Sequence, residues 1–405
     1  MCGIAGFMAR PGGRVPDGLA LKFAGLLAHR GPDGTGARLV GDTLLVHRRL
    51  AVIDVAGGAQ PLVLPDGTAL VANAEIYDYA ERRRELAGAA FATGSDCEVP
   101  LHLYARKGVA FADDLRGMYA IAIHDPMQGR LVLARDPFGI KPLYVAETPA
   151  GVAFASEPHV LIDAGLVARA LDPGVRDELL ALQFTCGAAT AFAGIRRVLP
   201  GETLALAGGR VIARRRRRAL PDGPPATWSE AEALQRLDAA LAESVMLHRR
   251  SDVPYGVFLS GGVDSGAVLG AMARDGLDGV TAYTIAFADP AARDEADDAR
   301  RAAAAVGARH VAVPFDAADF WAYLPKVAAA LDDPAADYAA VPTYKLAEAA
   351  AREVKVVLTG EGGDELFAGY GRYRRALKPW WLGGRGTRQR AALAGLGVLR
   401  REPVA

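Results

Sequence analysis

The chain has 405 residues, 51% of them hydrophobic, and its 47 lysines and arginines balance its 47 aspartates and glutamates. This length suggests two domains, and the zero net charge argues against a general affinity for nucleic acid or for an anionic membrane. The sequence contains no apolar run of the roughly eighteen residues that a membrane span needs and no secretory signal pattern, and its three cysteines lack metal-ligand spacing and make a poor disulfide framework. We therefore expect a cytoplasmic protein.

The first half of the sequence predicts mostly short strands. Apolar runs bounded by turn-forming residues lie at 43–46, 69–71, 119–124 and 130–134. An arginine run follows at 214–218, and a stretch rich in proline and glycine lies at 221–225. We interpret 214–228 as a solvated linker between domains. An RNA or membrane contact is the alternative, and it is disfavoured because no aromatic residues interleave with the arginines.

The pattern changes after this linker. Helical spacing occurs at 231–246, 264–274 and 294–306, and short apolar strands are predicted at 254–259, 280–287, 310–313 and 354–358. Strands that alternate with helices predict βαβ units and a parallel sheet. The second half is therefore predicted to be an α/β domain.

The start of the chain carries a candidate nucleophile. Aminopeptidases can remove a methionine that precedes a small residue, which would make Cys2 the terminal residue. A terminal α-amine has a reference pKa of about 7.7–8.0, so it is partly neutral at physiological pH and can accept the thiol proton without a histidine. Taken alone, Cys2 fits an ordinary buried cysteine better than a nucleophile.

A series of motifs follows Cys2 in a fixed order. They are HRGPD at 29–33, HRRLAVID at 47–54, NAEIYD at 73–78, SDCE at 95–98, RDPFGIKPLY at 135–144 and SE at 156–157. The series closely resembles the class II glutamine amidotransferase domain, and we assign residues 2–213 to it. The resemblance implies an α+β domain with the αββα layers of N-terminal-nucleophile hydrolases, in which Cys2 releases ammonia from glutamine.

Several of these residues suit the functional groups of glutamine. Arg49 can hold the α-carboxylate with a two-pronged contact, and Asp96, with Glu75 beside it, can accept hydrogen bonds from the α-ammonium. By analogy with the family, the Asn73 side chain and the Ala74 backbone N–H form the oxyanion hole. Alone, Arg49 or Asp96 would fit a surface ion pair equally well. The glutamine site implied by the resemblance comprises Arg49, Leu50, Ala51, Val52, Ile53, Asn73, Ala74, Glu75 and Asp96.

One position departs from the family pattern. Glycine is usual where this chain has Ala74. Alanine keeps the N–H donor, but it fits a positive φ less well than glycine does. If the position requires a positive φ, we expect a weaker glutaminase.

The second half contains a candidate phosphate loop. After a predicted strand, and opening a predicted helix, come Leu259, Ser260, Gly261, Gly262, Val263, Asp264 and Ser265. Small residues there let backbone N–H groups surround an anion, and the helix N-terminus adds partial positive charge. The run resembles the pyrophosphate loop of N-type ATP pyrophosphatases and differs from the Walker A pattern.

An acidic, glycine-rich loop follows a later strand. The run TGEGGDE at 359–365 resembles a signature of the asparagine synthetase family, in which Glu361 would support formation of an acyl-adenylate. Asp264 and Asp364 are our candidates for holding Mg²⁺ on the phosphates, because loops at the carboxyl ends of parallel strands converge on one crevice. Either loop alone would also fit a simple turn. Further nucleotide contacts are implied for Leu259, Ile285, Thr359 and Gly360.

The two halves together imply one reaction. Ammonia from glutamine would pass inside the protein to a carboxylate that ATP has activated as an acyl-AMP, and with aspartate as acceptor the product would be asparagine. We expect glutamine, ATP, Mg²⁺ and aspartate as ligands, a homodimer as in the family, and neither nucleic acid nor membrane as a partner. Family members continue well beyond the acidic loop and supply a lysine there, so we expect 229–405 to be a partial, C-terminally truncated ATP-binding domain.

Several alternatives stay open. The acceptor can be another carboxylate, since relatives with this architecture amidate other substrates or close β-lactam rings. The chain can also be a glutaminase whose partial second domain only binds a nucleotide or a partner. A non-catalytic role is disfavoured by the presence of Cys2, Arg49, Asn73 and Asp96. An RNA-modifying pyrophosphatase is disfavoured by the neutral charge and the glutaminase motifs.

Overall fold

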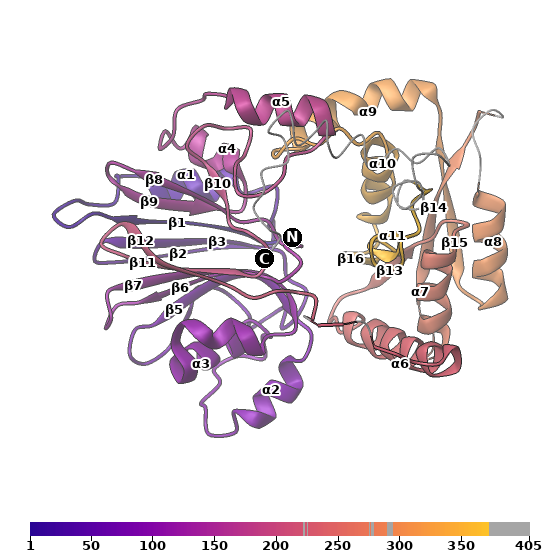
Figure 1. Cartoon of the computed structure of the whole chain (residues 1–405), viewed down its shortest axis with the longest axis horizontal. Coiled ribbons are helices and arrows are strands. Elements are labelled where there is room, and N and C mark those ends of the chain that lie inside the picture. Colours follow the sequence, from indigo (N-terminus) through magenta and orange to yellow (C-terminus); the bar gives the residue numbers. More distant parts are fainter. Residues whose placement is uncertain (222, 225, 275, 277–278, 290–294, 372–405) are drawn as a thin grey trace. The chain divides into compact units, whose positions relative to one another are not determined.

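The computed structural model describes residues 1–221, 223–224, 226–274, 276, 279–289 and 295–371. The described chain forms two compact units (Figure 1). Unit 1 contains residues 1–239, 247–253 and 324–338, and unit 2 contains the rest of the described chain. Two short segments from the second half of the sequence, 247–253 and 324–338, therefore pack with the N-terminal unit.

Unit 1 is built on two six-stranded sheets, and the strands in both are antiparallel. The first sheet has the order β10-β8-β9-β1-β3-β2 and consists of β1 (Gly3–Ala9), β2 (Gly34–Val40), β3 (Thr43–Arg49), β8 (Tyr144–Thr148), β9 (Gly151–Ala155) and β10 (Arg196–Arg197). The second has the order β12-β11-β7-β6-β5-β4 and consists of β4 (Leu62–Val63), β5 (Ala69–Ile76), β6 (Gly117–Asp125), β7 (Arg130–Arg135), β11 (Glu202–Ala207) and β12 (Arg210–Arg216).

Helices cover the outer face of each sheet of unit 1 (Figure 1). The first sheet carries α1 (Leu19–Leu26) and α4 (Pro158–Asp163), and α5 (Pro173–Leu182) follows later in the chain. The second sheet carries α2 (Tyr79–Glu85), α3 (Glu98–Lys107) and the 3-10 helix η1 (Gly108–Asp114). Three apolar clusters fill the layers, one between the sheets and one under each helical layer. The predicted αββα architecture is confirmed.

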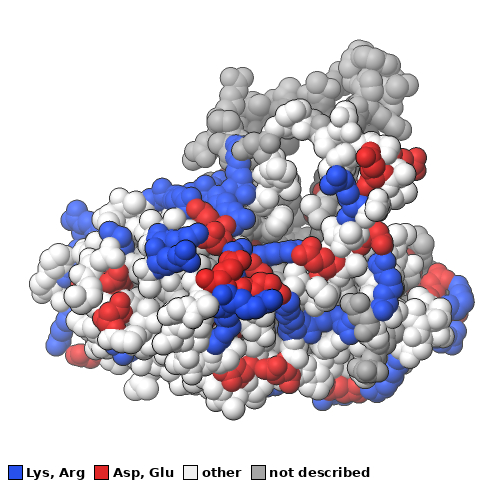
Figure 2. Space-filling model, turned by 90° about the horizontal axis from the view of Figure 1, so that it is seen from below, with Lys and Arg blue, Asp and Glu red and all other residues white. Residues whose placement is uncertain are grey.

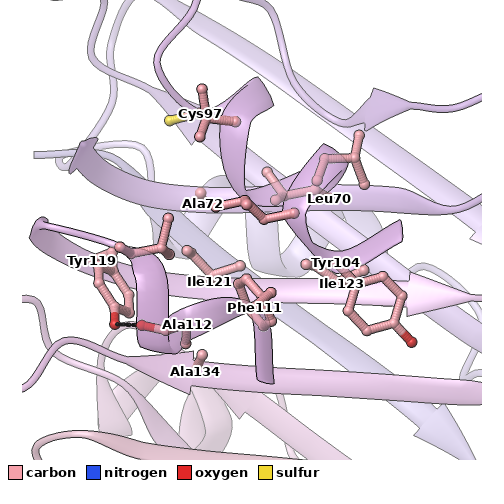
Figure 3. Close-up of a cluster of buried hydrophobic side chains, with 14 of the residues drawn as sticks. Leu70, Ala72, Cys97, Tyr104, Phe111, Ala112, Tyr119, Ile121, Ile123 and Ala134 are labelled. Carbon is pink, nitrogen blue, oxygen red and sulfur yellow. Dashed lines mark hydrogen bonds between the residues drawn. The ribbon is translucent and has the colours of Figure 1, made fainter. Parts of the chain in front are cut away.

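The alternation of side chains along each strand assigns residues to these clusters. In β6, Ile121 and Ile123 pack with Tyr104 and Phe111 of the helical layer (Figure 3). Residues 120 and 122 of the same strand face the cluster between the sheets. Successive side chains of a strand point to opposite faces, so each strand contributes to two layers.

The arginine run does not begin a linker. Arg214, Arg215 and Arg216 belong to β12, where Arg216 pairs with Glu202 of β11. The strand lies at the edge of its sheet and is largely exposed, and charged side chains there hinder pairing with another chain. The predicted linker boundary at 214 is therefore wrong, because an exposed edge strand is as polar as a linker. Acidic and basic side chains intermingle on the face shown in Figure 2.

Unit 2 is built on a parallel sheet with the order β15-β14-β13-β16. Its strands are β13 (Tyr255–Phe258), β14 (Thr281–Phe287), β15 (Arg309–Phe315) and β16 (Val356–Leu358). Ala282 and Tyr283 are adjacent in β14 but belong to different apolar clusters, so the sheet is covered on both faces. The helices in this part of the chain are α6 (Glu230–His248), α7 (Val263–Arg274), α8 (Ala296–Ala305), α9 (Ala317–Ala330), α10 (Ala340–Ala350) and α11 (Gly363–Phe367).

The predicted parallel α/β sheet is confirmed, and each strand and helix predicted after the linker has a counterpart. Asp294, where one helix was predicted to begin, and residues 372–405 lie outside the described residues. Among the described residues, no helix has the length and apolar character needed to cross a membrane.

Candidate active sites

The first candidate site lies where the layer between the two sheets of unit 1 ends. Ile4 and Met8 of β1 face the apolar cluster between the sheets, and the same alternation directs Cys2 to this face. The Cys2 sulfur accepts a hydrogen bond from the Leu50 N–H at 3.3 Å. The Cys2 carbonyl accepts one from Arg30 Nε at 3.0 Å. The candidate nucleophile is therefore held at its side-chain sulfur and at its backbone carbonyl.

Burial governs the ionisation of this terminus. Burial raises the pKa of the Cys2 thiol, and the hydrogen bond from Leu50 partly opposes that rise. Burial, and then the charge of Arg30, lower the pKa of the Met1 α-amine to about 6. A terminal amine in these surroundings is mostly neutral at pH 7, which is the form that accepts a proton from a thiol.

Asn73 supplies the first of two free hydrogen-bond donors. Ala69 and Val71 of β5 face the cluster between the sheets, and Asn73 follows them on the same face. Asn73 is 2% exposed, and its Nδ2 atom is without a hydrogen-bond partner among the described residues. A buried donor without a partner costs about 1–3 kcal/mol, so the amide is suited to a ligand that bears an acceptor.

Ala74 supplies the second donor. The N–H groups of Ala72 and Ile76 point away from β6, because they donate to Gln60 Oε1 at 2.6 Å and to Asp96 Oδ2 at 2.8 Å. Backbone direction repeats every second residue, so the Ala74 N–H points to the same unpaired side of β5. The Asn73 amide and the Ala74 N–H are therefore two donors on adjacent residues that β6 does not engage within the described chain.

The backbone strain expected at Ala74 is absent. The residue lies within β5 and pairs with Tyr119 of β6. Among the described residues other than glycine, a positive φ occurs at Asp54, Gln183 and Ala368. Alanine therefore fits this position without the conformational cost that the sequence suggested.

Arg49 and the residues that follow form one wall of the site. The Arg49 guanidinium donates to the carbonyl groups of Ile53 at 3.4 Å, Asp54 at 2.6 Å and Val55 at 2.9 Å. The N–H of Ala51 donates to Asp33 Oδ2 at 2.8 Å. Residues 50–55 therefore curve around the Arg49 side chain. A guanidinium has five N–H groups, so two remain after these three hydrogen bonds and can donate to a ligand carboxylate.

Two carboxyl groups and an amine, those of Asp96, Glu75 and Lys141, form what we call the second wall of the candidate site. Burial raises the pKa of Asp96, and burial together with Asp96 raises the pKa of Glu75. Burial lowers the pKa of Lys141, while Glu75 and Cys2 oppose that change. A ligand ammonium would relieve the repulsion between the two carboxyl groups, because an opposite charge favours their ionised forms.

Asp136 positions Lys141. Its side chain is fully buried, and it accepts from the N–H groups of Ile140 at 2.9 Å and Lys141 at 3.0 Å. Arg135 Nε donates to the Lys141 carbonyl at 2.8 Å. Residues 135–144 belong to the family pattern, but the sequence predicts no role for Lys141, because only the fold brings it near Glu75.

Asp54 is a second residue of the candidate site for which the sequence predicted no role. Its carboxylate accepts from the Gly57 N–H at 2.9 Å and from the Gly94 N–H at 2.8 Å. It thereby ties the loop after Arg49 to the loop that contains Asp96. The local signal was an aspartate three residues before a glycine pair, a pattern typical of a turn capped by its own side chain.

The second candidate site lies in unit 2, at the carboxyl end of β13. Ser260 and Ser265 share a hydrogen bond at 2.9 Å between their hydroxyl groups, and Ser260 Oγ accepts from the Gly262 N–H at 3.1 Å. These contacts close residues 259–265 into a loop at the N-terminus of α7, where backbone N–H groups and the helix dipole favour an anion.

The loop after β16 packs against this phosphate loop. A Cβ atom added at Gly360 would lie 2.7 Å from the Ser265 backbone nitrogen, and one added at Gly363 would lie 2.5 Å from Asp264 Oδ2. Glycine at these positions therefore allows the two loops to meet. The predicted residues 259–265 and 359–364 are brought together in this way, with Glu361 exposed and Asp364 half-buried.

The remaining predicted nucleotide contacts lie at the same edge of the sheet. Leu259 follows β13 directly, and its N–H donates to the Tyr283 carbonyl at 2.9 Å. Ile285 lies near the carboxyl end of β14, and Thr359 follows the end of β16. Asp264 and Asp364 carry carboxylate oxygens, the ligand type that Mg²⁺ prefers, and phosphate oxygens would have to complete such a site.

Comparisons with known proteins agree with this division. A model described as "Glutamine amidotransferase domain" matches residues 1–216, and one described as "Asparagine synthase" matches residues 236–401. A putative glutamine-hydrolysing asparagine synthetase of Mycobacterium tuberculosis is 37% identical over 402 residues, covering 93% of this chain and 61% of the relative. Asparagine synthetase 1 of Bacillus subtilis is 36% identical over 400 residues, with 94% and 61% covered.

Relatives with another name also match. An amidase of Penicillium rubens, chyE, is 32% identical over 419 residues, covering 93% of this chain and 60% of the relative. The chain thus spans about three fifths of the length of these curated relatives.

Proposed function

This chain belongs to the family of glutamine-hydrolysing asparagine synthetases, and on that basis we propose that it is a glutamine-dependent amide ligase with aspartate as its acceptor. The proposed reaction converts L-aspartate, L-glutamine, ATP and water to L-asparagine, L-glutamate, AMP and diphosphate through a β-aspartyl-AMP intermediate. We place it in the cytoplasm, because the nucleophilic thiol must stay reduced.

In the proposed glutaminase step, the thiolate of Cys2 attacks the side-chain amide carbon of glutamine. The terminal amine accepts the thiol proton and returns it to the departing ammonia. Asn73 Nδ2 and the Ala74 N–H donate to the oxygen on which negative charge develops, and water then releases glutamate from the thioester. One such donor lowers the barrier by about 2.7–4 kcal/mol.

The polar walls would orient glutamine. Arg49 donates its remaining N–H groups to the α-carboxylate, and Asp96 and Glu75 accept from the α-ammonium. The Asp54 carboxylate connects the two walls through Gly57 and Gly94. This arrangement would favour a ligand that carries both a carboxylate and an ammonium group.

In the proposed synthetase step, residues 259–265 hold the phosphates of ATP, and Asp264 and Asp364 would hold Mg²⁺. The metal would neutralise charge on the phosphates while the acceptor carboxylate attacks the α-phosphorus and diphosphate leaves. Ammonia then displaces AMP from the activated carboxylate. Glu361 is proposed to support this step from the loop after β16.

The observation that carries the proposal is the buried Asn73 Nδ2 donor, which has no hydrogen-bond partner among the described residues, next to an Ala74 N–H that points away from β6. Burial raises the pKa of the Cys2 thiol, and the charge of Glu75, the residue after Ala74, adds to that rise. An ordinary structural cysteine would not need such donors.

A second candidate function differs only in the acceptor. The Penicillium amidase carries another name at 32% identity over a similar share of the chain, so a different carboxylate could take the place of aspartate. A glutaminase without ligase activity is the third candidate, since the chain spans only part of its relatives.

The experiment that tests the proposal is the release of AMP from Mg-ATP in the presence of glutamine, with aspartate added or withheld. Aspartate-dependent AMP together with asparagine supports the first candidate. AMP release only with another carboxylate supports the second. Hydrolysis of glutamine without AMP formation for every carboxylate tested would leave a glutaminase.

A further inference from the structure

Residues 247–253, which we call the connector, comprise the last two residues of α6 and the segment that leads toward β13, and they lie outside the matched amidotransferase domain. They nevertheless pack within unit 1. Their contacts with this unit include hydrogen bonds, an ion pair and a contact between two rings.

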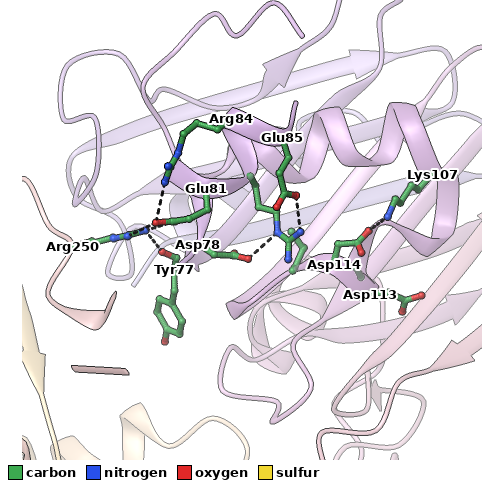
Figure 4. A network of polar contacts seen from close by, with 12 residues as sticks. Tyr77, Asp78, Glu81, Arg84, Glu85, Lys107, Asp113, Asp114 and Arg250 are labelled. Atoms are coloured by element: carbon green, nitrogen blue, oxygen red, sulfur yellow. Dashed lines mark hydrogen bonds and ion pairs between the residues drawn. The ribbon is translucent and has the colours of Figure 1, made fainter. Parts of the chain in front are cut away.

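Arg250 makes the first set of contacts. Its two terminal nitrogens each lie 2.8 Å from an oxygen of the Glu81 carboxylate, and one of them also donates to the Tyr77 carbonyl at 2.6 Å (Figure 4). The ring of His248 lies 4.0 Å from the ring of Tyr77, centre to centre. Two parallel N–H···O bonds fix the direction of a guanidinium as well as its position.

Asp252 makes the second set. Its Oδ2 atom accepts from the Asp54 N–H at 2.7 Å, and its own N–H donates to the Val52 carbonyl at 3.1 Å. The backbone and the side chain of Asp252 therefore hold residues 52–54 at both ends through hydrogen bonds. The Asp54 carboxylate also accepts a hydrogen bond from the Gly94 N–H, so the series of contacts continues to the loop that contains Asp96.

These contacts reach both walls of the proposed glutamine site. Val52 belongs to the wall that Arg49 forms, and the Asp54 carbonyl accepts from Arg49 itself. Tyr77 follows Ile76, whose N–H donates to Asp96 of the second wall. The connector thus supports the wall formed by Arg49 through Asp252, and it supports the wall that contains Asp96 through Arg250.

We propose that Arg250 and Asp252 are positioning residues for glutamine, so that the glutamine site is completed by a segment from beyond the amidotransferase domain. Neither residue needs to touch the substrate. Arg250 fixes the end of β5 beside Asp96, and Asp252 fixes the turn that carries the remaining N–H groups of Arg49 toward the α-carboxylate. The proposal rests on the glutaminase step of the proposed function.

The test uses glutamate release by the whole chain, without ATP or aspartate. Arg250→Ala and Asp252→Ala are each expected to raise the KM for glutamine about five- to tenfold and to leave kcat within about twofold. Asp252→Asn keeps an acceptor oxygen and should stay close to the parent protein. Arg236→Ala is the matched control, because it removes an arginine of α6 that lies over Trp228.

A charge exchange separates positioning from general damage to the fold. Arg250→Glu alone should raise KM, and Arg250→Glu combined with Glu81→Arg should restore it in part, which a misfolded variant would not do. The dissociation constant of glutamine is measured in parallel on the Cys2→Ala background by calorimetry. It should rise by the same factor as KM in Arg250→Ala and Asp252→Ala.

The outcomes separate this inference from the proposed function. An active parent protein whose KM and dissociation constant are unchanged by Arg250→Ala and Asp252→Ala would overturn the positioning role alone. A parent protein that binds glutamine but releases no glutamate would overturn the glutaminase step, and the dissociation constants would then decide on the connector. A parent protein that does not bind glutamine would overturn both.

Discussion

His47 offers a test of how the two sheets of unit 1 are held together beside the site. The residue lies in β3 of one sheet and is 1% exposed, and its Nε2 donates to the Ala72 carbonyl of β5 in the other sheet at 3.2 Å. Arg49 lies two residues further along β3, and Asn73 follows Ala72. This bond therefore fixes two proposed site residues relative to each other.

The magnitude follows from the ionisation of His47. Burial lowers its pKa from 6.5 to about 3, so the folded protein keeps the ring neutral where the unfolded chain would protonate it. Stability is therefore lost as the pH falls below the unfolded value of 6.5. Between pH 7 and pH 5 the loss is about 2 kcal/mol, at about 1.36 kcal/mol per pH unit.

The substitution His47→Gln removes this dependence while keeping an amide that can donate to Ala72. Hydrogen exchange followed by mass spectrometry gives the opening free energy of β3 and β5 at both pH values. The parent protein should lose about 2 kcal/mol more than the variant between pH 7 and pH 5. Peptides from β13 and β14 serve as the internal control, and their change with pH should be equal in both proteins. If the change in β3 and β5 were also equal in the two proteins, the conclusion that His47 is buried in its neutral form would be refuted.

Three further predictions concern the proposed chemistry. Cys2→Ala should abolish glutamate release but leave AMP formation supported by ammonium salts, and loss of both would contradict separate sites. Asn73→Ala should lower the kcat for glutamine about 10²–10³-fold with little change in KM, and an unaltered kcat would remove this residue from the oxyanion hole. Gly363→Ala places a Cβ atom 2.5 Å from Asp264 Oδ2 and must displace that carboxylate, so ATP affinity measured by calorimetry should fall while glutamate release stays constant. Unaltered ATP affinity would show that the carboxylate does not take part in nucleotide binding.

Local patterns were sufficient to predict much of the fold. The run at 119–124 lies within β6, and the run at 264–274 lies within α7, because alternation and helical spacing are properties of short segments. The prediction for the arginine run was wrong, since the hydrogen bonds that make it part of an edge strand come from β11. Polarity alone does not distinguish an exposed edge strand from a linker.

The candidate sites were predictable only in part. The motifs named Cys2, Asn73 and the loops after β13 and β16, and whether each binds or reacts as proposed stays a prediction. The link from Asp54 to Gly94 spans 40 positions of the sequence, and the connector bond from Arg250 to Tyr77 spans 173. No short pattern records such contacts.

The most direct test of the central claim is to treat the protein with 6-diazo-5-oxo-L-norleucine, a reactive glutamine analogue, and to map the adduct by mass spectrometry. We predict one adduct per chain on Cys2, in a peptide that has lost Met1, and protection by excess glutamine. An adduct on Cys97 or Cys186, labelling of Cys2 with Met1 retained, or no protection by glutamine would contradict the assignment of Cys2 as the glutaminase nucleophile.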